Sequence, residues 1–154
     1  MNNFIISLLP QGSTIPYELL LLADPSYQAI EIYLPYSDVF VVELAHKVIG
    51  VYVLYPLNKQ ESEIKNIAVL EKYQGKGIGK LLLQHAIAEA RKRAYKKLWI
   101  GTSNASIGQL YLYQQQGFEI TELKKNFFID NYPEPIFENG LQCKHILMLC
   151  QPIE

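Results

Sequence analysis

The sequence predicts one domain of the α/β or α+β class, built around a mixed sheet. Strand-like segments precede, alternate with and follow amphipathic helical segments along the 154 residues, and this order is typical of that class. No repeat, low-complexity tract or Pro/Gly/Ser-rich linker divides the chain. Hydrophobic residues make up 49% of the sequence and charged residues 19%, which indicates a packed core rather than disorder.

The N-terminal elements begin with a strand over residues 3–9, which a Pro-Gln-Gly-Ser turn ends. Pro16 favours a short helix over the following segment, YELLLLA. The pair Asp24-Pro25 has the residue types of an N-cap and a first helical position. A second helix is therefore predicted from this pair to about Leu34.

Strands are predicted next over residues 39–45, 48–54 and 63–69, where apolar and β-branched side chains dominate. The first two of these strands flank His46-Lys47, which we expect to form the turn of a β-hairpin. The third strand leads through the segment LEKY into a glycine-rich loop.

The second half of the chain begins with a long amphipathic helix over residues 78–94, followed by a short strand over residues 97–101. Another helix is predicted over residues 106–116, because Gly117 suits the position just after a helix C-terminus. The last two strands are predicted over residues 118–129 and 141–149, joined by the irregular segment YPEPIFENG.

Charge is unevenly distributed along the chain, although the formal net charge is only −1. Residues 1–46 contain no Lys or Arg, whereas residues 71–97 are strongly basic. This asymmetry suits a protein that holds a phosphate-rich ligand together with a cationic one; for residues 91–97 a solvated helix face is the alternative interpretation. The basic block is too small to favour nucleic-acid binding, and the apolar runs are far shorter than the roughly 20 residues of a membrane span.

The two cysteines, Cys143 and Cys150, are expected to be free thiols. In an extended strand they would lie too far apart for a disulfide, and their spacing is not that of a zinc site. We therefore predict no metal site, and a reduced, cytoplasmic compartment.

The stretch QGKGIGK, residues 74–80, places three glycines at alternate positions directly before the long helix. A Walker A loop would need glycine at Gln74 and Ser or Thr at Leu81, and a dinucleotide fingerprint starting at Gly75 would need glycine at Lys80. Neither motif is present. The remaining interpretation is a backbone that approaches an anion closely at a helix N-terminus.

The glycine loop and its surroundings, EIKNIAVLEKYQGKGIGKLLLQHAIAEA, resemble the GNAT superfamily of N-acetyltransferases. Gln74, Gly77 and Gly79 fill the family signature [Q/R]-x-x-G-x-[G/A]. A second family element, a helix ending in L-Y-x-x-x-G-F, is matched downstream within NASIGQLYLYQQQGF by Leu112-Tyr113 and Gly117-Phe118. Together the two blocks make a specific signal.

The resemblance covers roughly residues 39–149 and implies a single GNAT-like domain over residues 1–154. Its fold would be a mixed, mostly antiparallel sheet of about six to seven strands flanked by about four helices. The acetyl-CoA-binding core would span about residues 39–118.

By the same resemblance, the chain would be an N-acetyltransferase that moves the acetyl group of acetyl-CoA to a primary amine by direct attack in a ternary complex. A non-catalytic acetyl-CoA-binding sensor or interaction module is the alternative. The acceptor would be a small-molecule or peptide amine, with no nucleic-acid or membrane partner, and a homodimer is compatible with this assignment. The residues expected to bind the cofactor are Ile67, Ala68, Val69, Gln74, Gly75, Lys76, Gly77, Ile78, Gly79, Lys80 and Asn104.

The spacing around Asn104 departs from the family pattern. Relatives often carry Asn seven residues before the family tyrosine, but Ser106 stands there and Asn104 lies two residues earlier.

The resemblance also implies that Tyr113 is the general acid that protonates the leaving thiolate. Tyr111 is the other candidate residue, and a mechanism without a side-chain acid is the third alternative. On a helix the two tyrosine side chains point to opposite sides. Because Tyr111 shares a face with Ile107, we expect it to pack in the core.

Glu63 is the candidate general base, with a water chain, Glu31 or Glu43 as alternatives. Even spacing would place Glu63 on the same side of its strand as Ile67 and Val69 if no bulge intervenes. The backbone N–H of Val69 would stabilise the oxyanion. We expect His85 and Glu89 to form a surface pair. The acceptor site would be lined by aromatic and acidic residues, namely Tyr33, Tyr36, Tyr132, Phe137, Glu31, Glu134 and Glu138.

Overall fold

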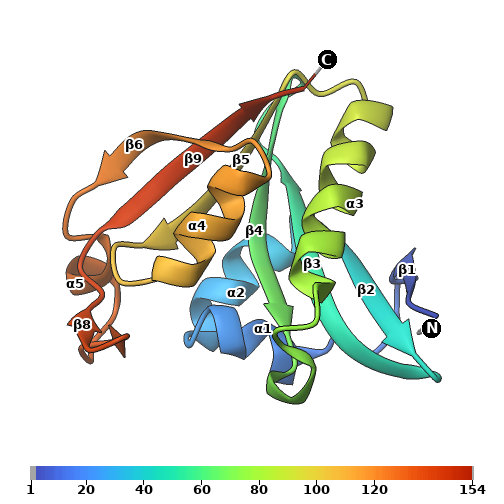
Figure 1. Ribbon diagram of the computed structural model, residues 1–154, viewed down its shortest axis with the longest axis horizontal. Coiled ribbons are helices and arrows are strands. Elements are labelled where there is room, and N and C mark those ends of the chain that lie inside the picture. Colours follow the sequence, from blue (N-terminus) through green and yellow to red (C-terminus); the bar gives the residue numbers. More distant parts are fainter. Residues whose placement is uncertain (1–2, 154) are drawn as a thin grey trace.

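The computed structural model describes residues 3–153 and shows a seven-stranded mixed sheet with helices on both faces (Figure 1). Neighbouring strands are antiparallel except for the central pair β4 and β5, which are parallel. The predicted fold class is therefore confirmed. In sheet order the strands are β1 (Ile5–Leu8), β2 (Asp38–Leu44), β3 (Lys47–Pro56), β4 (Glu61–Val69), β5 (Lys97–Ser103), β9 (Ile146–Pro152) and β6 (Glu119–Lys124).

Within the described residues, five α-helices and two short 3₁₀ helices accompany the sheet, together with a small hairpin of β7 (Phe137–Glu138) and β8 (Leu141–Gln142). None of the helices within residues 3–153 is long and apolar enough to cross a membrane. The helices are α1 (Tyr17–Ala23), α2 (Tyr27–Tyr33), η1 (Leu34–Tyr36), η2 (Glu71–Tyr73), α3 (Ile78–Lys92), α4 (Ile107–Gln115) and α5 (Phe127–Asn131).

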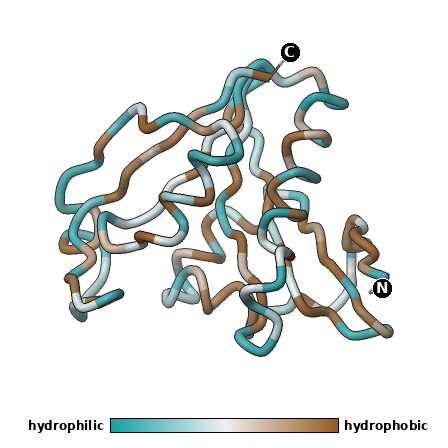
Figure 2. The backbone as a smooth tube through the Cα atoms, in the orientation of Figure 1, coloured by the Kyte–Doolittle hydropathy of each residue, from teal (hydrophilic) through white to brown (hydrophobic). Residues whose placement is uncertain are grey.

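The core has two parts because side chains of the central strands alternate between the two faces of the sheet. On one face, Leu82 and Ala86 of α3 are fully buried against Phe40 and Tyr52. On the other face, Leu20 of α1 packs with the apolar residues of β2 and β3 that point the opposite way. Each such leucine contributes about 1.5–3 kcal/mol through burial. Figure 2 shows the central strands as mostly hydrophobic and the loop between β4 and α3 as mostly hydrophilic.

The predicted hairpin turn and the predicted start of the second helix were wrong by one or two residues. The β2–β3 turn is formed by Ala45 and His46, whose φ angles are 51° and 66°, so Lys47 pairs with Leu44 rather than lying in the turn. Positive φ at both positions is the geometry of a two-residue hairpin. Helix α2 begins after Ser26 instead of Asp24, because the Ser26 hydroxyl accepts a hydrogen bond from the N–H of Ala29 at 3.1 Å.

The predicted strand over residues 118–129 is also wrong in its second half, where β6 gives way to α5. The change of direction occurs at Asn126, which has a φ of 60° and donates its N–H to Nδ1 of His145 at 2.9 Å. The predicted strand over residues 141–149 is likewise split into β8 and β9. Both cysteines are free, as predicted.

Candidate active site

The two central strands, β4 and β5, form a fork. They pair in register from Glu61 with Lys97 to Ile64 with Ile100, and no pairing continues beyond that point. On the other edge of β4 the pairing with β3 continues to Val69. The sheet therefore opens between the last residues of β4 and β5.

The open edge of β4 presents backbone hydrogen-bonding groups. Because the N–H of Leu70 donates to the carbonyl of Ile49 at 2.9 Å, Val69 and Gly50 form a non-hydrogen-bonded pair of the antiparallel ladder. The N–H and C=O of Val69 therefore point away from β3, toward the fork, and those of Ile67 do the same. This is the geometry of a strand that can pair with an extended ligand.

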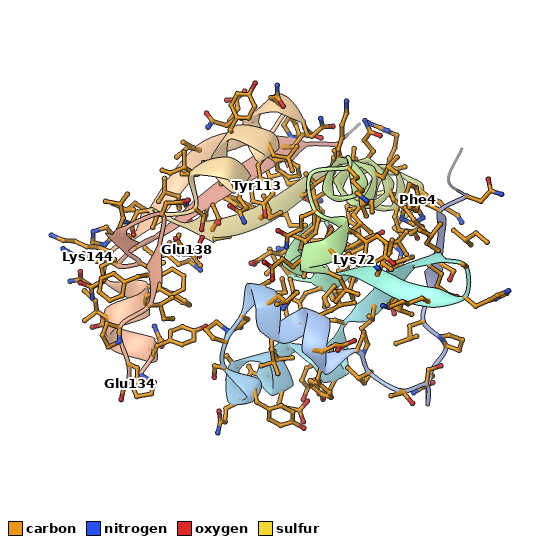
Figure 3. The ribbon with its side chains drawn as sticks, turned by 60° about the horizontal axis from the view of Figure 1, so that its bottom comes forward. Phe4, Lys72, Tyr113, Glu134, Glu138 and Lys144 are labelled. Atoms are coloured by element: carbon orange, nitrogen blue, oxygen red, sulfur yellow. The ribbon has the colours of Figure 1, made fainter. Side chains whose placement is uncertain are left out.

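The fork opens into a cavity of about 1000 Å³. Its walls come from α1 and α2, β4, the glycine loop, β5, α4 and α5. In Figure 3, Tyr113 and Glu138 lie on the C-terminal half of the molecule and Lys72 lies on the loop of the other half. The size of the cavity is suited to a cofactor arm and a small acceptor, since ligand pockets usually measure about 300–1,000 Å³.

The glycine loop forms one end of this cavity. Gly75 and Gly77 have φ angles of 76° and 83°, a left-handed conformation that glycine adopts at low cost. Gly77 is the N-cap of α3, and its carbonyl accepts the first helical hydrogen bond from Leu81. The N–H groups of residues 78–80 consequently have no partner within the helix and lie at its positive end, where anions bind.

Side chains also shape this end of the cavity. Gln74 donates its Nε2 to the carbonyl of Val69 at 2.9 Å, which ties the loop to the end of β4. Lys80 lines the cavity together with Gly75, Gly77, Ile78 and Gly79. Lys76 does not line it; its Nζ lies over the ring of Tyr73, 5.8 Å from the centroid.

Tyr113 lies in the cavity wall on α4 and is only 4% exposed. Its ring packs edge-on against Phe118 at 6.4 Å. Burial, with a smaller effect from the carboxylate of Glu138, raises the pKa of Tyr113 well above the ordinary value for a phenol. The side chain therefore stays protonated and can act as a proton donor.

Tyr111 does not occupy the core position that we expected. It is 65% exposed, as is much of Ile107 on the same face, and its hydroxyl accepts a hydrogen bond from Gln115. The expected pairing of His85 with Glu89 is replaced by other contacts: His85 Nδ1 lies 2.7 Å from the hydroxyl of Tyr52, and Glu89 pairs with Arg93.

A β-bulge overturns the expected placement of Glu63. Leu54 pairs with Ile64 and Val53 with Asn66, so Lys65 is an extra residue on β4. Glu63 therefore lies on the opposite face of the sheet from Ile67 and Val69, on the side of α1 and α2. It still lines the cavity, 9% exposed, with Lys65 Nζ at 3.3 Å.

The alternative bases Glu31 and Glu43 do not line the cavity; Glu31 accepts a hydrogen bond from Tyr17 at the surface. Of the seven residues expected to wall the acceptor site, Tyr33, Tyr132 and Glu138 line the cavity. Tyr36, Phe137 and Glu134 do not.

Tyr33 and Tyr132 take part in specific hydrogen bonds. The buried Nδ2 of Asn66 donates to the Tyr33 hydroxyl at 3.0 Å, and the Tyr132 hydroxyl donates to Asp24 Oδ1 at 2.8 Å.

A polar cluster that was not predicted from the sequence holds Glu138, an expected acceptor-site residue, in the cavity wall. The Ser106 hydroxyl donates to Glu138 Oε2 at 2.9 Å and lies 2.9 Å from the hydroxyl of Ser103. Glu138 reaches this position because the β7–β8 hairpin turns at Asn139-Gly140, with φ angles of 52° and 75°. Asn-Gly is the strongest short hairpin signal, so this element could have been found from the sequence.

Asn104, expected to bind the cofactor, does not line the cavity. Its Oδ1 accepts hydrogen bonds from the N–H groups of Lys144 and His145, and its Nδ2 donates to the carbonyl of Gln142. The side chain thus holds the connection between β8 and β9 in place. No group of three or more His, Cys, Asp or Glu side chains within residues 3–153 is arranged to hold a metal ion.

Known proteins share this architecture. The model of the acetyltransferase (GNAT) family matches residues 10–118. The chain is 45% identical over 149 residues to Uncharacterized N-acetyltransferase YvbK of Bacillus subtilis (strain 168), covering 97% of this chain and 96% of that protein.

Two solved structures are similar over almost their whole length. A GNAT family acetyltransferase from Elizabethkingia anophelis, with acetyl-CoA bound, is 51% identical, with a TM-score of 0.95 over 97% of this chain and 98% of the other. A Bacillus subtilis acetyltransferase in complex with CoA is 41% identical, with a TM-score of 0.93 over 99% and 100% of the two chains.

Proposed function

Because the chain belongs to the acetyltransferase (GNAT) family, we propose that it transfers the acetyl group of acetyl-CoA to a primary amine by direct attack within a ternary complex. The observation that carries this proposal is the fork between β4 and β5, which opens into one cavity with an anion-binding loop at one end and a protonated phenol in its wall.

The residues that line this cavity fit acetyl-CoA. The free N–H groups at the start of α3 would bind the pyrophosphate, with Lys80 adding positive charge beside them. The open edge of β4 at Ile67 and Val69 would pair with the amides of the pantetheine arm, as a neighbouring strand would. The N–H of Val69 would then donate to the thioester oxygen, where negative charge develops during attack.

The candidate acid and base come from opposite faces of the sheet. Tyr113 belongs to the core beneath α3, the helix that follows the glycine loop, whereas Glu63 lies on the side of α1 and α2. Such an arrangement suits direct transfer, because the thiolate leaves on the cofactor side and the amine attacks from the other side. We assign proton donation to the thiolate to Tyr113, and removal of the ammonium proton to Glu63, directly or through water.

This proposal is tested by measuring free-thiol release from acetyl-CoA with a panel of amines, amino sugars and peptides, alongside calorimetric binding of acetyl-CoA. Acceptor-dependent thiol release supports the transferase. Tight acetyl-CoA binding without transfer to any acceptor would favour a non-catalytic binding module instead. Absence of acetyl-CoA binding would contradict the assignment of the glycine loop.

A further inference from the structure

The acceptor end of the cavity is bridged by one hydrogen bond between two distant segments. The Tyr132 hydroxyl, just after α5, donates to Asp24 Oδ1, between α1 and α2, at 2.8 Å. Within residues 3–153, no other hydrogen bond or ion pair joins the segment 126–145 to α1 or α2. This one bond therefore connects the wall of the cavity that follows α5 to the wall formed by α1 and α2.

Both partners of this bridge are held in position. Asp24 Oδ1 also accepts a hydrogen bond from the N–H of Ser26 at 3.1 Å, which fixes the carboxylate at the start of α2. The Tyr132 ring lies 5.6 Å from the ring of Phe128 and 6.5 Å from that of Phe127. Since neither partner is a free surface side chain, the bridge is a built feature of the wall.

The same wall has the chemistry of a site for a small cation with an apolar body. Phe127, Phe128 and Tyr132 supply aromatic surface, and Asp24 and Glu63 supply carboxylates. Lys65, which pairs with Glu63, and Lys124 are the cationic groups at this end of the cavity. An amine arrives protonated, so it is attracted by the carboxylates and packs against the rings.

We propose that the Tyr132–Asp24 bridge determines acceptor specificity, restricting the enzyme to small free amines with a compact apolar body and excluding the amines of polypeptides. This inference rests on the proposed function, because it names the acceptor of the same reaction. A polypeptide must leave the site through the side that the bridge closes, whereas a small amine fits inside the remaining volume. The cavity of about 1000 Å³ must also hold the cofactor arm.

The first test compares two acceptors, 2-phenylethylamine and an alanine-initiated decapeptide, in the native protein and in Tyr132→Phe. A hydrogen bond to a carboxylate favours the conformation with the Tyr132–Asp24 bridge over the one without it by roughly tenfold or more. The native protein should therefore prefer the small amine by at least about tenfold in kcat/KM, and Tyr132→Phe should reduce this preference severalfold, with Asp24→Ala acting alike. Tyr36→Phe, which alters an exposed tyrosine outside the cavity wall, is the matched control and should leave the ratio unchanged.

The second test detects loss of the bridge without measuring acetyl transfer. Cys143 is 2% exposed and lines the cavity, and burial raises the pKa of its thiol. In a Cys150→Ala background, Tyr132→Phe should raise the rate at which a bulky maleimide modifies Cys143 by roughly tenfold, while Tyr36→Phe should not.

The outcomes separate the two proposals. Equal kcat/KM for both acceptors in the native protein would overturn the proposal that the bridge determines specificity, and so would an unchanged rate of Cys143 modification in Tyr132→Phe. Neither result would contradict the proposed acetyltransferase function. Faster Cys143 modification without transfer to either acceptor would support the closing role of the bridge and count against the proposed function and the acceptor class together.

Discussion

Replacing Gly77 by alanine tests how the glycine loop binds its anion. An added Cβ at Gly77 meets no atom within 4 Å, so the substitution introduces no clash. Its cost arises from the φ of 83°, because a side chain in the left-handed region costs about 1–2 kcal/mol. If the free protein keeps this conformation, the cost appears as a lower free energy of unfolding. If the loop relaxes, the same cost appears on binding, as an acetyl-CoA Kd raised by about 5- to 30-fold.

The assay therefore combines urea denaturation with calorimetric titration of acetyl-CoA, and the two losses should sum to about 1–2 kcal/mol. Gly12→Ala is the matched control, because Gly12 has a φ of 86°, also meets no atom within 4 Å and lies outside the cavity wall. It should lower stability by a similar amount and leave acetyl-CoA affinity unchanged. A sum near zero for Gly77→Ala, or an equal loss of affinity in Gly12→Ala, would refute this account of the loop.

Three further substitutions address proton transfer and stability. Tyr113→Phe should lower kcat by about 10²–10⁴-fold while acetyl-CoA affinity stays within a small factor; unchanged turnover in steady-state kinetics would remove Tyr113 from the mechanism. Glu63→Gln should depress mainly the low-pH side of the kcat/KM profile, where the amine must lose its proton, and a uniform effect at all pH values would place the base elsewhere. Burial lowers the pKa of His85, so the folded protein favours the neutral ring, and stability falls as pH drops below the unfolded value of about 6.5. His85→Gln should flatten this loss of unfolding free energy in urea titrations at about pH 7 and 5, and an equally steep loss would contradict it.

Local signals in the sequence predicted the elements that carry them. The apolar period of α3 and the glycines before it specified the helix, its buried face and the loop, because each depends on residues close together in the chain. Gly117 marked the end of α4 for the same reason, with a φ of 98°. The Asn139-Gly140 hairpin had an equally local signal, although it was hidden within a segment taken as irregular.

The features that the sequence does not specify depend on pairing between distant residues. The bulge at Lys65 is defined by the register of β4 against β3, and no residue type at that position announces it. The fork between β4 and β5 is defined by where pairing stops, so the sequence of either strand alone is silent about it. Asn126 ends β6 through a contact with His145, a partner that only the folded sheet brings near.

The fork also leaves the two parts of the sheet joined by a short run of strand pairs. Within residues 3–153, only the pairs from Glu61–Lys97 to Ile64–Ile100 connect β1–β4 to β5, β9 and β6 within the sheet, so few backbone hydrogen bonds of the sheet must open for β4 and β5 to separate locally. Local openings of this kind expose amides to hydrogen exchange without global unfolding. A ligand lying along the open edge of β4 would form hydrogen bonds where the pairing between β4 and β5 stops, and would so connect the two parts of the sheet. Amides of β5 and β9 should then exchange more slowly when acetyl-CoA is bound, even at positions far from the glycine loop.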